Sequence, residues 1–173
     1  MQYLNKHEYT KKQCMVEAAY ILHRQNQNKQ ALQMLQRVPE EQRSSRFYDF
    51  TQAQVMYKLG RFQEALDLFS GPNSELYGDI GDQVDDLCTN IAACAANQSA
   101  VSDKCEKIFS EFDGQLESFE FDFNASLVSL KQQDFSGAIS RLLTAFEKAN
   151  KEDCGVKELT RFKVQELHMI NCF

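Results

Sequence analysis

Tryptophan is absent from this chain, proline occurs twice, and glycine occurs only seven times in 173 residues. So little turn-forming material argues against a fold of many short strands. No apolar run approaches the roughly 20 residues that cross a bilayer. The polar N-terminal segment also lacks the apolar stretch of a secretory signal. These absences predict an all-α protein that is soluble and cytoplasmic.

Motifs for catalysis or metal binding are also missing. The chain has three histidines, no Cys-x-x-Cys pair and none of the common phosphate-binding or nucleophile motifs. The acidic stretch YGDIGDQVDD lacks the ligand spacing and the glycine of a calcium loop, so it indicates a helix N-terminus. We therefore expect no enzymatic activity, no cofactor and no metal.

Six cysteines lie within helix-like segments such as IAACAA, which predicts reduced cysteines that act as small core residues. Charge is uneven along the chain. Residues 49–130 hold fifteen acidic and four basic side chains, whereas residues 1–48 are net basic. An acidic middle disfavours wrapping of nucleic acid, which needs clustered cations. It suits a basic or mixed-charge protein partner, or it is ordinary solvated helix surface.

One short pattern occurs three times: NQNKQALQML (26–35), GRFQEALDLF (60–69) and QDFSGAISRLL (133–143). The central alanines of the first two copies, Ala31 and Ala65, are separated by the period of the tetratricopeptide helical hairpin, about 34 residues. The alanine of the third copy, Ala138, follows Ala65 after slightly more than two such periods. A degenerate unit, NIAACAANQ followed by SDKCEKIF, fills the gap.

Small residues recur where two helices of a hairpin would meet. We expect close helix approach at Ala19, Ala53, Ala92 and Ser126 on the first helices, and at Ala31, Ala65 and Ala138 on the second helices. Larger residues between them would fill the layer. Each hairpin would then bury the rest of its apolar surface against its neighbours.

The predicted architecture is a single domain, 1–173, an α-solenoid of about four tetratricopeptide-like hairpins plus a flanking C-terminal helix. The predicted helices are 9–25, 28–37, 45–59, 62–70, 80–97, 101–112, 116–132, 135–150 and 156–171. The last resembles the first helix of a further unit, which indicates a fragment of a longer protein, although a capping helix would explain it too.

A peptide-binding groove is expected on the first helices of the hairpins, where aromatics and amides would hold an extended segment. Packing between units is an equal alternative for each aromatic, Phe47 and Phe123 especially. The candidate groove residues are Tyr20, His23, Arg24, Phe50, Gln54, Tyr57, Lys58, Asn90, Asn97, Phe123, Asn124, Leu127 and Lys131.

Several segments resemble one family more closely than the repeat consensus requires. TNIAACAA in the degenerate third unit and FNASLVSLKQQDFSGAI in the fourth are similar to the seventy-two-kilodalton subunit of the signal recognition particle, over roughly residues 15–150. The resemblance implies a scaffold that grips the C-terminal part of the sixty-eight-kilodalton subunit. It also implies a role in co-translational targeting to the endoplasmic reticulum, with no direct RNA contact by this segment.

Two alternatives remain open from the sequence. One is an adaptor for another peptide, such as a chaperone tail whose terminal carboxylate is held by Arg24, Lys58, Lys131 and the amides of Asn90 and Asn124. The other is a self-assembling array that pairs through the apolar face of the C-terminal helix.

Overall fold

The computed structural model describes residues 14–71, 81–98, 100–112 and 114–151. These residues form eight α-helices and one short 3-10 turn, with no strand among them. The all-α prediction is therefore confirmed for the described part of the chain. The chain divides into two compact units, Met1–Asp79 and Ile80–Phe173.

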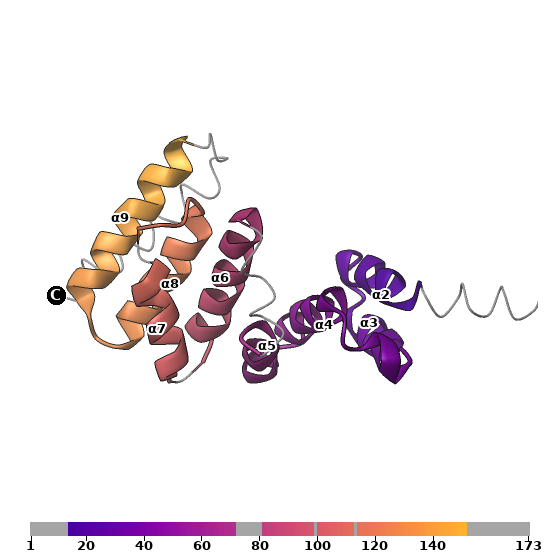
Figure 1. Cartoon of the computed structure of the whole chain (residues 1–173). Helices are drawn as coiled ribbons and strands as arrows, with labels where there is room; N and C mark the ends of the chain where they lie inside the picture. Colours follow the sequence, from indigo (N-terminus) through magenta and orange to yellow (C-terminus); the bar gives the residue numbers. More distant parts are fainter. Residues whose placement is uncertain (1–13, 72–80, 99, 113, 152–173) are drawn as a thin grey trace, which may run out of the picture. The chain divides into compact units, whose positions relative to one another are not determined.

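The first unit contains two helix pairs. Its elements are α2 (Met15–Arg24), α3 (Asn28–Gln36), the 3-10 turn η1 (Glu40–Gln42), α4 (Arg46–Lys58) and α5 (Phe62–Phe69). α2 packs on α3, α4 packs on α5, and α4 also contacts both helices of the preceding pair (Figure 1). The second pair is thus stacked on the first.

The second unit contains α6 (Gly81–Ala96), α7 (Asp103–Phe112), α8 (Phe119–Lys131) and α9 (Phe135–Lys151). α8 packs against both α6 and α9 (Figure 1). Every predicted helix end that falls on described residues lies within three residues of the observed one. Residues 9–13 and the predicted helix 156–171 lie outside the described residues.

Three helix hairpins share one turn geometry. The residue two places before each second helix has a left-handed backbone: φ is 60° at Asn26, 77° at Gly60 and 62° at Gln133. The next N–H donates to the carbonyl oxygen five residues back, in the Schellman arrangement that closes a helix C-terminus. These bonds join Gln27 to Leu22 (2.8 Å), Arg61 to Met56 (3.0 Å) and Asp134 to Ser129 (3.0 Å).

The small residues lie inside the hairpins, as the sequence predicts. All seven are 0% exposed: Ala19, Ala53, Ala92, Ser126, Ala31, Ala65 and Ala138. The Ser126 hydroxyl donates to the Phe123 carbonyl at 2.7 Å, so its burial leaves no unsatisfied donor. Large side chains fill the space around them, among them Leu35 at 0% and Phe69 at 2% exposed.

The first helices of two hairpins also begin in the same way. The Ser45 hydroxyl accepts a hydrogen bond from the Tyr48 N–H, and the Ser118 hydroxyl accepts one from the Phe121 N–H, both at 3.2 Å. Such caps stabilise a helix by about 1 kcal/mol. The sequence spacing between the two serines equals the spacing between the buried alanines of the same hairpins. The caps are therefore part of the repeat, although the sequence pattern did not reveal them.

Candidate functional site

The predicted groove residues come from the first helix of each hairpin, namely α2 and α4 in the first unit and α6 and α8 in the second, except Asn97, which directly follows α6. They therefore form two sets, one in each unit. The structure brings together members of each set, and it assigns several of them to packing rather than to an open surface.

The first unit presents an aromatic patch that joins α2 to α4. The Tyr20 ring lies 5.8 Å from the Phe47 ring on α4, and the His23 ring lies 6.4 Å from Tyr20. Phe47 is 42% exposed, one of three large apolar side chains that are exposed among the described residues. Of the two alternatives for Phe47, the structure supports a surface position. An exposed aromatic beside a half-buried tyrosine is a typical anchor for a protein partner.

His23 stabilises the hairpin turn. Its Nδ1 lies 2.8 Å from the Oδ1 of the buried Asn28, whose amide nitrogen donates to the Asn26 Oδ1 at 3.0 Å. Because an amide oxygen only accepts, this arrangement makes Nδ1 the donor nitrogen of the ring. The histidine is therefore held in one orientation beside Tyr20, and a structural role accounts for its position.

Three further predicted residues of the first unit, Phe50, Gln54 and Tyr57, lie along α4. Phe50 packs edge-on against Phe69, with ring centroids 5.6 Å apart, and Tyr57 packs in the same way against Phe62 at 5.4 Å. Both rings thus attach α4 to α5 and remain half-buried. Gln54, which lies between them on α4, is also half-buried.

A basic side chain lies at the C-terminus of each first helix of this unit. Arg24 and Lys58 are exposed, and each is the last residue of its helix, α2 or α4. They are separated by one repeat period and occupy the same position in the repeat. They therefore add positive charge at corresponding ends of the two helices that carry Tyr20 and Phe47.

In the second unit, Phe123 belongs to the core. It is 7% exposed and packs with Ala138 and Leu142 of α9, and Leu127 packs against the same cluster. Of the two alternatives for Phe123, packing is correct, and its inclusion among the open groove residues is wrong. The short side chains of α9 leave room for a phenyl ring between α8 and α9, which explains its burial.

The polar groove residues of the second unit have partners within the protein. The Lys131 ammonium donates to the Gln98 carbonyl at 2.7 Å, and the Asn97 amide donates to the Ala93 carbonyl at 2.8 Å. Asn90 and Asn124 are half-buried on α6 and α8. Since Lys131 and Asn97 hold backbone carbonyls, little of this set is free to hold a terminal carboxylate.

The described cysteines are free thiols, and three of them are buried. Burial raises the pKa of Cys88 to about 12, with the nearby Asp85 and Glu111 carboxylates adding to the effect. Burial also raises the pKa of Cys94 to about 12, with a smaller contribution from Cys105. Such thiols are poor nucleophiles and metal ligands. Within the described residues, no group of histidine, cysteine and acidic side chains could hold a metal ion.

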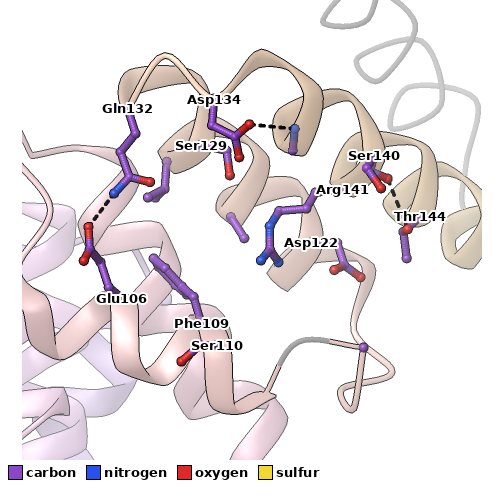
Figure 2. Close-up of a pocket in the computed structure, with 14 residues that line it drawn as sticks. Glu106, Phe109, Ser110, Asp122, Ser129, Gln132, Asp134, Ser140, Arg141 and Thr144 are labelled. Carbon is purple, nitrogen blue, oxygen red and sulfur yellow. Dashed lines mark hydrogen bonds between the residues drawn. The ribbon is translucent and has the colours of Figure 1, made fainter.

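A polar cleft between α7, α8 and α9 was not predicted. Its volume is about 710 Å³, within the range of small-ligand pockets. Figure 2 shows Arg141 reaching into it from α9, with Glu106 and Phe109 on the opposite wall formed by α7. α7 is joined to α8 by the Phe109–Phe121 ring contact at 6.0 Å and by the Gln132–Glu106 hydrogen bond at 2.6 Å.

A comparison of two hairpins within the sequence indicates this cleft. When the hairpin α4–α5 is aligned with α8–α9 through their buried alanines, three apolar residues fall opposite polar ones: Met56 opposite Ser129, Leu59 opposite Gln132, and Leu68 opposite Arg141. Each of the three later residues lines the cleft. Met56 is buried and Leu59 packs against the core of the first unit. The hairpin α4–α5 is therefore apolar at three positions where the hairpin α8–α9 is polar.

A buried ion pair lies beside the cleft. The Asp122 carboxylate, 3% exposed, accepts from the Lys148 ammonium at 2.5 Å, and the same ammonium donates to the Leu116 carbonyl at 2.6 Å. Lys148 thereby fastens α9 both to α8 and to the segment that precedes α8. The pair neutralises a carboxylate that would otherwise be costly to bury.

The described residues are all-helical apart from turns and connecting segments, and most of them form helix hairpins. Comparison of the chain with protein-family models, with curated proteins and with solved structures finds no match to any of them. In the described part of the chain, no helix has both the length and the apolar character needed to span a membrane.

Proposed function

We propose that this chain is a non-catalytic protein-binding scaffold of tetratricopeptide-type hairpins. One observation carries the proposal. Three hairpins share a left-handed turn residue, a Schellman bond and a fully buried alanine at the same position after that turn residue. The first two are separated by the tetratricopeptide period of about 34 residues, and the third follows after slightly more than two such periods. Repeats of this type stack and use the exposed sides of their helices for binding.

The binding surface that we propose lies on α2 and α4 of the first unit. It combines the Tyr20–Phe47 aromatic pair with the half-buried Gln54 and the cations Arg24 and Lys58. Aromatic side chains supply contact area at a small cost in conformational entropy, and cations at the edge steer an acidic or mixed-charge segment. An extended or helical peptide segment is therefore the expected ligand.

The partner that we propose is the C-terminal part of the sixty-eight-kilodalton subunit of the signal recognition particle. The resemblance of TNIAACAA and FNASLVSLKQQDFSGAI to the seventy-two-kilodalton subunit supports this choice. The chain would then act in co-translational targeting and associate with the endoplasmic reticulum through the particle. Its excess of acidic side chains makes direct RNA binding unfavourable.

Calorimetric titration with that segment tests the proposal. We expect submicromolar binding by the unaltered chain. Phe47→Ala should weaken binding about tenfold or more, because truncation of an aromatic anchor typically costs more than about 1.4 kcal/mol. Ile21→Ala, a change at an exposed apolar residue of α2, serves as the matched control. Absence of binding would exclude this partner, and equal weakening by both changes would move the site away from the Tyr20–Phe47 pair.

A further inference from the structure

Two buried polar atoms of α4 lack a hydrogen-bonding partner within the protein. They are the hydroxyl oxygen of Thr51 and the amide oxygen Oε1 of Gln54, and neither atom has a partner among the residues that the structure describes. Buried polar atoms without partners are rare in native proteins, because their loss of hydration is not offset by a new hydrogen bond. Each of the two atoms therefore destabilises the free chain.

The two side chains differ in their access to the surface. Thr51 is 0% exposed, so no partner molecule reaches its hydroxyl. Gln54 is half-buried, so part of its side chain remains at the surface of the protein. Rotation about its side-chain bonds turns the amide outward, whereas the Thr51 hydroxyl stays enclosed. Of the two, Gln54 is the residue that can gain a hydrogen bond from a ligand.

Gln54 lies in the aromatic part of the binding surface proposed above. Phe47, Phe50 and Gln54 follow one another at spacings of three and four residues, so they share one face of α4. Tyr57 continues this face three residues further along the helix. Phe50 and Tyr57 are fixed against α5 by their edge-on ring contacts. The amide of Gln54 thus has an anchored aromatic ring on each side of it along the helix.

An amide between aromatic rings favours the main chain of an extended peptide as its ligand. A glutamine side chain has one acceptor oxygen and an NH2 group with two donors, which match the N–H and C=O groups of a peptide. An extended segment has these groups free, and its side chains project from the main chain to contact the rings. In the interior of an α-helix the same groups are already bonded to each other. An extended segment therefore fits this surface better than a helical one.

We propose that Gln54 determines the specificity of this surface by binding the main chain of the partner, which lies across α4 in an extended conformation. Oε1 of Gln54 accepts a hydrogen bond from one peptide N–H of the partner, and the amide nitrogen donates to a carbonyl group of the same segment. The inference rests on the function proposed above, and it narrows the ligand from an extended or helical segment to an extended one.

The experiment measures, by calorimetry, the binding of the C-terminal segment of the sixty-eight-kilodalton subunit to the whole chain. The segment is prepared in versions that are each methylated at one peptide nitrogen, which removes a single N–H and keeps every side chain. We expect one position, or two neighbouring ones, at which methylation weakens binding about fivefold to tenfold.

Two variants of α4 assign this effect to Gln54. Gln54→Leu removes the amide at similar volume, so it should weaken the unmodified segment by the same factor and should abolish the effect of the sensitive methylation. The free variant should be no less stable in urea denaturation, because an unpaired acceptor has been removed. A purely structural role of Gln54 would instead lower stability and affinity together. Thr51→Val, the matched control, removes the other unpaired atom of the same helix and should leave the affinity unchanged.

Three results would overturn the proposal. One is an affinity that Gln54→Leu leaves unchanged, which would mean that water rather than the partner pairs with the amide. Another is a methylation effect of equal size in the unaltered chain and in Gln54→Leu, which would place the sensitive N–H elsewhere. The third is weakening at most positions of the segment, as a helical ligand would show. In all three the segment still binds, whereas absence of binding to the unaltered chain would contradict the proposed function and this inference with it.

Discussion

The hairpins α4–α5 and α8–α9 have the same backbone plan and different side chains on it. Both begin with a serine cap, turn through a left-handed residue and bury an alanine completely in the second helix. The earlier hairpin has Met56, Leu59 and Leu68 where the later one has Ser129, Gln132 and Arg141. The comparison shows that turn chemistry and small-residue spacing define the hairpin, while other positions are free to become a core or a cleft.

The largest expected effect concerns the ion pairs of the two hairpins. Asp122→Ala removes one partner of the buried pair with Lys148 and leaves the ammonium without its counter-ion. We expect a loss of about 3 kcal/mol in the free energy of unfolding, measured by urea denaturation. Glu64→Ala removes one partner of the exposed pair with Arg61 in the earlier hairpin and should leave the midpoint unchanged. Equal losses from the two changes would contradict this difference.

The next prediction tests the apolar and polar positions directly. Met56→Ala should cost about 2 kcal/mol, because it opens a cavity beside a side chain that is 5% exposed. The corresponding change in the later hairpin, Ser129→Ala, borders an existing cleft and should cost less than about 0.5 kcal/mol. Thermal unfolding of both variants measures the difference. A large loss for Ser129→Ala would show that its hydroxyl supports the fold.

Overpacking should affect the two hairpins alike. Ala65→Leu and Ala138→Leu each insert a branched side chain at a position that is 0% exposed. Each should cost on the order of 1–3 kcal/mol, since neither interface has room for the added atoms. Urea denaturation of the two variants in parallel gives the comparison. Unchanged stability in either one would contradict the close approach of helices in that hairpin.

The smallest effects on stability are expected at the two turns, where one substitution should lower stability and the other should raise it. Gly60→Ala places a β-carbon on a left-handed residue, and no neighbouring atom lies within 4 Å of that β-carbon. The expected loss of about 1 kcal/mol is therefore purely conformational. Gln133→Gly relieves the same strain in the later hairpin and should raise stability by a few tenths of a kcal/mol, up to about 1 kcal/mol. A loss on Gln133→Gly would mean that its side chain contributes more than its backbone strain costs.

Much of the fold could be predicted from the sequence because the repeat encodes it locally. The spacing of Ala31, Ala65 and Ala138 identified the second helices, and the gaps between the predicted helices at 26–27 and 60–61 located the turns. The caps at Ser45 and Ser118 were not predicted, since serine is common before helices and in loops alike and does not by itself identify a cap.

The candidate site was less predictable than the fold. Helical projection placed Phe123 on a groove, but a side chain at the edge of a helix face can turn inward when the facing helix carries small residues such as Ala138. The polar cleft depends on three helices meeting, which a single helical projection does not capture. Alignment of the two hairpins through their buried alanines would have revealed its polar positions Ser129, Gln132 and Arg141.

The most direct test of the scaffold is hydrogen–deuterium exchange of the chain with and without the C-terminal segment of the sixty-eight-kilodalton subunit. We predict slower exchange along α2 and α4, around Tyr20 and Phe47, and unchanged exchange in α7 and α9. Slower exchange confined to α7 and α9, or no change in any helix, would contradict the claim that α2 and α4 bind this partner.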